Sequence, residues 1–234
     1  DHTTRSRGRK QDNRKSGENN QMVNNTTPSL TMPNQGNTCL LSTSYFAPIA
    51  WYQALYRHDH AIIESCDSYY KQTYRNRCII ATANATQTLT VPVERDHGTK
   101  QIMRDIRISD HGNWRHVHWN ALQSAYNLSP FFEYYADDIR PFFEKRWTYL
   151  IDFNLDICQK ICELLDIQPS YALSQQWTTH EQCLEHNIDD LRGDLTLSTA
   201  KPYYQVFAQK HGFQADLSIL DLLFNMGNEA VLWL

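Results

Sequence analysis

The sequence predicts an α/β protein, in which an N-terminal sheet region of strand, helix and strand is followed by a mostly helical second half. Short apolar runs between polar residues predict strands in the first half, and apolar residues at helical spacing predict helices after residue 114. With 234 residues, 41% of them hydrophobic, the chain can build a sizeable core. No apolar run approaches the ~18 residues of a membrane-spanning helix, so no membrane span is expected.

Charge and composition divide the chain into two parts. Residues 1–38 are rich in Asn, Gln, Ser, Thr, Arg and Gly, and they have almost nothing to bury, which predicts a disordered polar tail. Residues 39–234 are predicted to form a single α/β domain. The tail carries a net charge of +3, whereas the remainder carries −7. An acidic body argues against nucleic-acid binding, because that activity requires many contacts to phosphates.

The first half of the domain predicts strands around one helix. Residue 48 is a proline suited to the first turn of that helix, which is expected over 49–58. Ile102, Ile106 and Ile108 alternate with polar residues and predict a strand over 102–108. Apolar runs predict the other strands, over 39–44, 61–66, 78–81 and 88–93.

The second half predicts helices with clear start and stop signals. A helix is expected over 114–127, Ser129 and Pro130 read as an N-cap and first helical residue, and Pro141 marks a boundary. An apolar stripe from Trp147 to Leu165 predicts a long buried helix. The remaining expectations are a short strand over 171–173, a polar connection to 200, a capping box from Ser218 to Asp221, and a helix end at Gly227 in the left-handed conformation.

Cysteine spacing and missing motifs limit the chemistry. The six cysteines form no Cys-x-x-Cys, and no Cys/His spacing matches a zinc site, so no metal is expected and a reducing, cytoplasmic location is predicted. Cys158 and Cys162, four residues apart, read as core residues of a helix. The sequence contains no glycine-rich dinucleotide loop, phosphate loop or nucleophile elbow, and whether the protein uses a cofactor stays unknown at this point.

The segment Lys71-Gln-Thr-Tyr-Arg-Asn-Arg77 concentrates polar and cationic groups before an apolar run. If the segment is extended, Lys71, Arg75 and Arg77 share one face, and Gln72, Tyr74 and Asn76 share the other. A row of cations suits phosphate or carboxylate, because each guanidinium can donate two parallel hydrogen bonds. The alternative, a solvated edge strand with scattered charge, stays open.

Two further residues are site candidates. At 100° per residue, His118 falls in the arc of Val117, Ala121, Leu122 and Ala125, while His116 points the opposite way. An imidazole that faces the interior is either a hydrogen-bonded core histidine or an acid–base group at a cavity wall. Tyr45 lies at a strand-to-helix turn, where open α/β sheets bind ligands, and is expected to stack on a ligand ring.

Taken together, these segments resemble the WbqC-like proteins of bacteria over about residues 39–234. The opening turn departs from the Gln-Pro-Tyr-like turn usual in that family, because this chain has Ser42-Thr43-Ser44-Tyr45. The resemblance implies a link to surface polysaccharide (O-antigen) biosynthesis but supplies no reaction. It is carried by Ser44-Tyr-Phe-Ala-Pro-Ile49, Lys71–Arg77, Val91-Pro-Val93, Trp114-x-x-x-His118 with Tyr126, Ser129-Pro-Phe-Phe-Glu-Tyr-Tyr135, and Leu217–Gly227.

The leading functional hypothesis is a group-transfer enzyme that acts on an anionic substrate, a sugar phosphate or a nucleotide sugar. His118 would transfer a proton and Tyr45 would stack on a ring. The groups expected to bind the substrate are Lys71, Gln72, Arg75, Asn76 and Arg77. The alternative is a non-catalytic accessory protein of a polysaccharide assembly complex. A concave pocket lined by these residues would favour the enzyme, and a flat surface would favour the accessory protein.

Overall fold

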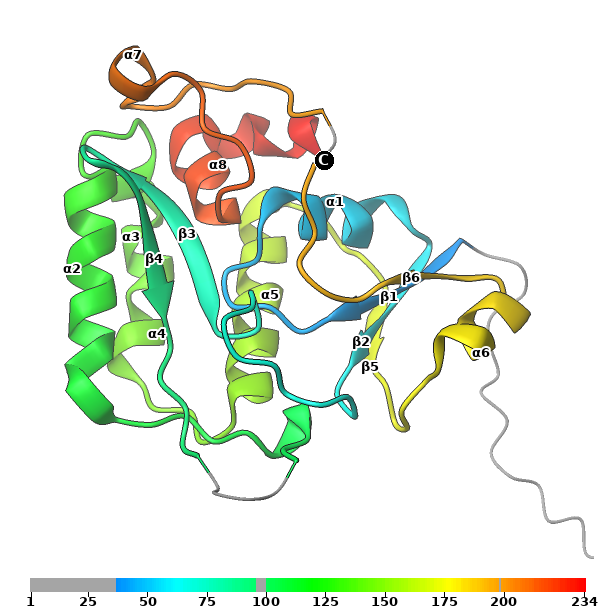
Figure 1. Cartoon of the computed structure of the whole chain (residues 1–234). Helices are drawn as coiled ribbons and strands as arrows, with labels where there is room; N and C mark the ends of the chain where they lie inside the picture. Colours follow the sequence, from blue (N-terminus) through cyan, green and yellow to red (C-terminus); the bar gives the residue numbers. More distant parts are fainter. Residues whose placement is uncertain (1–36, 96–99, 198) are drawn as a thin grey trace, which may run out of the picture. The chain divides into compact units, whose positions relative to one another are not determined.

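The computed structural model describes residues 37–95, 100–197 and 199–234, and it confirms the α/β fold class (Figure 1). Most of the proposed tail, 1–36, lies outside the described residues. Strand β1 (Thr38–Ser42) opens at the last residue of that tail. Within the described ranges, no helix is long and apolar enough to cross a membrane.

A four-stranded parallel sheet forms the N-terminal region, in the order β5-β2-β1-β6. Strand β1 is followed by helix α1 (Ile49–Arg57) and then by β2 (His60–Glu64), as the sequence predicts. In the register, Ser42 lies opposite Glu64, and Leu41 lies opposite Leu191 of β6 (Ile188–Leu191). The carboxyl ends of these three strands therefore meet at one edge of the sheet. Strand β5 (Tyr171–Leu173) pairs with β2 on the other side.

Helix α6 (His180–Glu185) and strand β6 occupy the region that the sequence presents as a polar connection. Thr179 and Gln182 form a reciprocal capping box at the start of α6. Strand β6 carries Asp189 and Asp190, and acidic residues are depleted in strands, so its composition conceals it. Strand β6 forms because its backbone pairs with β1, an interaction that its own residues do not indicate.

A separate antiparallel hairpin joins β3 (Arg77–Thr82) to β4 (Ala85–Thr90). It lies beside helix α2 (Trp114–Tyr126) in Figure 1, and the Tyr126 hydroxyl accepts a hydrogen bond from the Ala81 backbone N–H at 3.3 Å. The strand expected over 88–93 is therefore shifted toward the N-terminus and ends before Pro92, which has no N–H to donate to a ladder.

The strand expected over 102–108 is wrong. The chain forms a 3-10 helix, η1 (Met103–Asp105), between isolated bridges at Ile102 and Ile108. The backbone N–H of Met103 donates to the backbone carbonyl of Asp67 at 2.9 Å, and the N–H of Arg104 donates to the backbone carbonyl of Ser65 at 2.9 Å. The loop after β2 thus satisfies this backbone. A second short 3-10 turn, η2 (His111–Asn113), precedes α2.

The helical half contains α3 (Phe132–Ile139), α4 (Pro141–Glu144), α5 (Leu150–Leu165), α7 (Ala208–His211), α8 (Ile219–Met226) and η3 (Gly227–Trp233). The boundary at Pro141 is confirmed, and Cys158 and Cys162 are buried in α5 as expected. The predicted N-cap Ser129 is wrong, because α3 begins at Phe132. The Ser129 N–H donates to the backbone carbonyl of Tyr126, and the Phe131 N–H donates to the backbone carbonyl of Phe224. These bonds hold residues 129–131 in a turn.

Ser218 caps α8 by accepting the Leu220 N–H at 3.2 Å, but Asp221 does not complete a capping box. Its carboxylate instead accepts hydrogen bonds from Tyr126 (2.8 Å), Tyr203 (2.6 Å) and Gln205 (2.9 Å). Burial raises the pKa of Asp221, and the three donors oppose that shift. Asp221 is thus a buried junction between α2, α8 and the chain before α7.

Gly227 ends α8 as the sequence predicts, with a φ of 57°. Its ψ of −130° lies outside the expected left-handed helical region. A Cβ atom at this position would lie 2.7 Å from the Phe131 ring. Both the backbone conformation and the close approach of the ring therefore require glycine.

Gly227→Ala is expected to lower the free energy of unfolding by about 3 kcal/mol, because the positive φ, which glycine alone tolerates with this ψ, and the overpacking against Phe131 each contribute. Denaturant unfolding measures the loss. Gly112→Ala is the matched control, since Gly112 has a φ of 72° but nothing within 4 Å of the added Cβ. Its expected loss is about 1 kcal/mol. Equal losses in both variants would show that the Phe131 contact is unimportant.

Candidate functional site

The segment from Lys71 to Arg77 is a turn and not an extended strand. Gln72 adopts a φ of 60°, and the Thr73 hydroxyl donates to the Tyr70 carbonyl at 3.0 Å. Only Arg77 belongs to a strand, as the first residue of β3. The expected alternation of two faces is therefore wrong, and the three cations of the segment take different positions.

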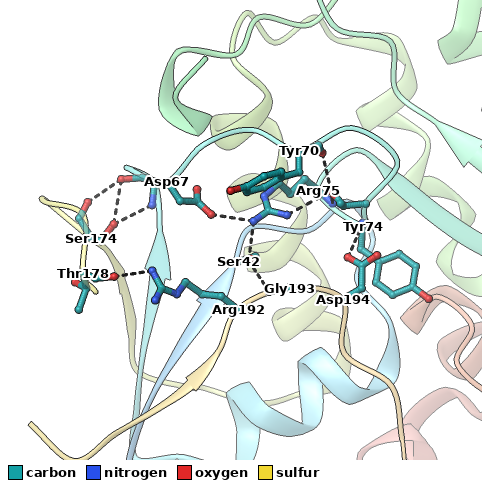
Figure 2. Close-up of polar contacts among 12 residues, drawn as sticks. Ser42, Asp67, Tyr70, Tyr74, Arg75, Ser174, Thr178, Arg192, Gly193 and Asp194 are labelled. Atoms are coloured by element: carbon teal, nitrogen blue, oxygen red, sulfur yellow. Dashed lines mark hydrogen bonds and ion pairs between the residues drawn. The ribbon is translucent and has the colours of Figure 1, made fainter. Parts of the chain in front are cut away.

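Arg75 is buried and serves the interior of the protein, not its surface. Its side chain is 6% exposed, and Nη2 donates to the Asp67 carboxylate at 2.9 Å and to the Ser42 hydroxyl at 3.2 Å (Figure 2). Its guanidinium also lies 5.3 Å from the centre of the Tyr70 ring. Because these partners enclose Arg75, its predicted role in substrate binding is corrected to a structural one.

The carboxyl edge of the parallel sheet holds this turn in place. The Ser42 hydroxyl, at the end of β1, also accepts the Gly193 N–H at 2.9 Å. The Tyr74 N–H donates to the Asp194 carboxylate at 2.9 Å, and the Asn154 amide of α5 donates to the Arg75 carbonyl at 2.9 Å. Figure 2 shows these contacts converging on the turn from β1, from the chain after β6 and from the loop after β2.

An open cavity of about 590 Å³ lies beside the turn. Four of the predicted site residues line it: Lys71, Gln72, Asn76 and Arg77. Residues that the sequence analysis did not select complete it, among them Tyr69, Thr90, Arg95, Gln101, Ser109 and His111. The signal for part of this wall was present, because Val91-Pro92-Val93 carries the family resemblance and lines the same cavity. This space is called the cationic cavity below.

Unpaired cations dominate the cationic cavity. The side chains of Lys71, Arg77 and Arg95 make no ion pair or hydrogen bond within the part of the chain that the structure describes. The Arg77 Nε is buried without a hydrogen-bond partner. The acid at the wall, Glu94, faces Arg107 at 3.5 Å. The cavity therefore concentrates positive charge on an otherwise acidic domain, which suits an anionic ligand.

The side chain of Asn76 contributes to the wall rather than to ligand binding. Its amide nitrogen donates to the Val91 carbonyl at 2.9 Å, and the residue is 5% exposed. The Val91 N–H in turn donates to the Asn76 carbonyl at 2.8 Å. This reciprocal pair ties the residue before β3 to Val91, directly after β4, and so fixes two segments that line the cavity.

His118 faces the interior and His116 is exposed, as the helical phase predicts, although Val117 in the same arc is 52% exposed. The His118 Nε2 lies 3.0 Å from the Thr90 carbonyl, and its Nδ1 lies 2.8 Å from the Tyr45 hydroxyl. Since a carbonyl only accepts, Nε2 carries the hydrogen and Nδ1 accepts from Tyr45. Burial lowers the pKa of His118 to about 4, so the ring is neutral near pH 7.

Tyr45 belongs to the core and cannot stack on a ligand. It is 0% exposed, and its ring lies 5.0 Å from Phe46 and 5.8 Å from Phe153. His118 likewise does not line the cationic cavity, although it holds the carbonyl of Thr90, which does. The imidazole at the cavity surface is His111, which no sequence motif marks.

Glu64 is a further residue of the carboxyl edge that the sequence analysis missed. It ends β2 with 0% exposure, and neither carboxylate oxygen has a partner of hydrogen-bond geometry. Burial and the neighbouring Asp67 raise the pKa of Glu64 to about 7, while Arg192 opposes the shift. An acid directly after the apolar run 61–63 was the signal available in the sequence.

Arg192 is held by partners of its own and does not neutralise Glu64. Its guanidinium makes hydrogen bonds of 2.9 and 2.8 Å to the Asp190 carboxylate and of 2.7 Å to the Thr178 carbonyl. The contact to Thr178 is drawn in Figure 2. The hydrogen bond from Arg192 lowers the pKa of Asp190 to about 2. Among the described residues, no group of three His, Cys, Asp or Glu side chains is placed to hold a metal ion.

Arg75→Ala is expected to lower the free energy of unfolding by about 3–5 kcal/mol, because Asp67 would stay buried without its partner. Denaturant unfolding tests this, with Arg104→Ala as the control. Arg104 forms an exposed pair with Asp105 at 3.8 Å, so its loss is expected to stay within about 1 kcal/mol. A stable Arg75→Ala variant that no longer binds anions would restore the substrate-binding assignment.

Glu64→Gln is expected to change how stability depends on pH. Because the pKa of Glu64 is raised in the folded state, from 4.5 to about 7, its contribution is full below pH 4.5 and is lost as the pH rises through about 7. Relative to Glu64→Gln, the natural protein should lose on the order of 2 kcal/mol between about pH 5 and pH 8, allowing for solvent screening. Urea unfolding at both pH values measures this, and parallel profiles would contradict it.

The chain is 30% identical over 199 residues to Uncharacterized protein Rv1507c of Mycobacterium tuberculosis (strain ATCC 25618 / H37Rv), an alignment that covers 74% of this chain and 86% of that protein. No solved structure matches the chain. The model of the WbqC-like protein family matches residues 43–193, from the end of β1 to the loop after β6, and therefore includes the buried Arg75 pair and the cationic cavity. This chain belongs to the WbqC-like protein family.

Proposed function

We propose that this protein is a cytoplasmic group-transfer enzyme of bacterial surface polysaccharide biosynthesis, of the O-antigen type, and that it acts on a phosphorylated or nucleotide-activated sugar. The observation that carries the proposal is the cationic cavity, in which Lys71, Arg77 and Arg95 have no partner among the described residues. The polysaccharide context rests on the family resemblance.

The geometry suits an anion that is held and then acted upon. Cations fixed on a wall before the ligand arrives need little rearrangement when charge develops in a reaction, and such preorganisation is a large source of catalysis. The wall here is rigid, since Arg77 begins a paired strand and Asn76 is bonded to Val91. His111 lines the cavity, so it takes the proton-transfer role that the sequence assigned to His118.

The alternative is a non-catalytic accessory protein that recognises the same anion. A recognition surface for a protein partner is commonly flat, whereas Lys71, Gln72, Asn76 and Arg77 line a concave space. This concavity favours the enzyme. His111→Gln separates the two, because it should reduce turnover by about 100-fold in an enzyme while leaving anion affinity nearly unchanged.

Arg77→Gln and Lys71→Gln are each expected to weaken the binding of inorganic pyrophosphate by about tenfold, because each removes one charge-assisted hydrogen bond. Isothermal titration calorimetry at low salt measures the affinity, and added salt should reduce it. Lys210→Gln is the control, since Lys210 lies on α7 and donates to Ala83 away from the cavity. Folded Arg77→Gln and Lys71→Gln variants with unchanged affinity would refute the proposal.

A further inference from the structure

A second cavity, of about 340 Å³, opens on the other side of the turn 109–113 from the cationic cavity. Ser109 and His111 line the cationic cavity, whereas Asp110 and Asn113 line the second one. Because consecutive Cα atoms lie about 3.8 Å apart, the lining residues 109–113 of the two cavities lie within roughly 10 Å of one another. A ligand that spans this turn would therefore contact both cavities.

Hydrogen bonds hold the turn between the two cavities in place. The Ser109 N–H donates to the Pro92 carbonyl at 2.9 Å, and the Trp114 indole N–H donates to the Ser109 carbonyl at 2.8 Å. Gly112 and Asn113 follow in the left-handed region, with φ of 72° and 48°. These two bonds tie Ser109 to Pro92, which lines the cationic cavity, and to Trp114, the first residue of α2.

The second cavity differs from the first in its charge. Asp110 accepts hydrogen bonds from Arg115 at 2.7 Å and from Arg146 at 2.6 Å. Arg140, which also lines this space, pairs with Asp137 at 3.2 Å. Each arginine of the second cavity therefore has a carboxylate partner, in contrast to Lys71, Arg77 and Arg95.

The side chains of the second cavity without a partner of opposite charge are Asn113, Trp119, Glu144 and His116, whose Nε2 lies 2.9 Å from the Asn120 amide. The Asn113 amide and the Trp119 indole N–H have no hydrogen-bond partner within the described ranges. Glu144 also makes no ion pair there. The Trp119 ring lies 5.8 Å from the Phe143 ring, and the Arg140 guanidinium lies 5.6 Å from the centre of the Trp119 ring. The hydroxyl groups of a sugar match the free Asn113 amide, which can donate and accept hydrogen bonds, and the free Trp119 indole N–H, which can donate one.

We infer that the second cavity binds the sugar ring of a ligand whose phosphate occupies the cationic cavity, and that Asn113 and Trp119 contact that ring. This inference rests on the proposed function and specifies its substrate class. A subsite with unpaired cations and a subsite with free hydrogen-bonding groups, on the two sides of one turn, correspond to the phosphate and the sugar of a sugar phosphate.

The test compares methyl phosphate, which has no sugar, with a panel of hexose 1-phosphates. The panel includes hexoses with and without a 2-acetamido group. Calorimetry with the full chain should show at least one hexose 1-phosphate binding about tenfold tighter than methyl phosphate. Asn113→Gly keeps the left-handed backbone and removes the amide, and Trp119→Phe keeps an aromatic ring and removes the N–H. Each should cost about fivefold for that hexose 1-phosphate and leave methyl phosphate unaffected.

Asn187→Gly is the matched control, because Asn187 is exposed, has a φ of 54° and lies between α6 and β6. It should change neither affinity. If no hexose 1-phosphate exceeds methyl phosphate, or if Asn113→Gly leaves the gain intact, the sugar subsite is refuted while the phosphate subsite stands. If Arg77→Gln does not weaken methyl phosphate binding, the proposed function fails, and the inference fails with it.

Discussion

The buried pair of Arg75 and Asp67 is the constraint on which the geometry of the site depends. Two charges removed from water are costly, so they persist only where their partners are complete and well placed. Here the completion comes from Ser42 at the end of β1 and from the Tyr70 ring. The turn therefore cannot shift along the sheet edge without exposing or orphaning a charge. Lys71 and Gln72 lie between Tyr70 and Arg75 in the chain, so these contacts also fix their position beside the cationic cavity.

This arrangement divides one short segment between two tasks. Arg75 and Asn76 point inward and hold the fold together, whereas Lys71 and Arg77 keep their charges unpaired at the cavity. The left-handed conformation of Gln72 makes the division possible, because it turns the chain between Lys71 and Arg75. An extended strand would have placed all three cations on one face, where mutual repulsion and solvent would have left none of them fixed.

The sequence predicted elements whose local pattern and tertiary role agree, and missed those in which they differ. Strands β1 and β2 and helix α5 are apolar where they are buried, so they were found. Strand β6 was missed because pairing with β1, and not its own acidic composition, stabilises it. The alternation of Ile102, Ile106 and Ile108 predicted a strand that does not form, because backbone groups of the loop after β2 accept the hydrogen bonds of this segment. For the site, the pattern located the segment 71–77 but not the direction of its side chains. Helical phase placed His118 inside correctly, yet phase does not reveal whether an interior position borders a cavity or a packed core.

Two buried titratable groups, His118 behind Thr90 and Glu64 at the carboxyl edge of the sheet, carry little charge near pH 7. His118 is held uncharged by burial, so it bridges Tyr45 and Thr90 as a structural link and adds no charge behind the wall. Glu64 has no cation of its own, because Arg75 is engaged by Asp67 and Arg192 by Asp190. Near pH 7 much of Glu64 therefore remains protonated. Had either arginine been left to Glu64, an extra carboxylate would stand at the carboxyl edge close to the turn. The pairing pattern removes that negative charge, and the field in the cationic cavity is left to Lys71, Arg77 and Arg95.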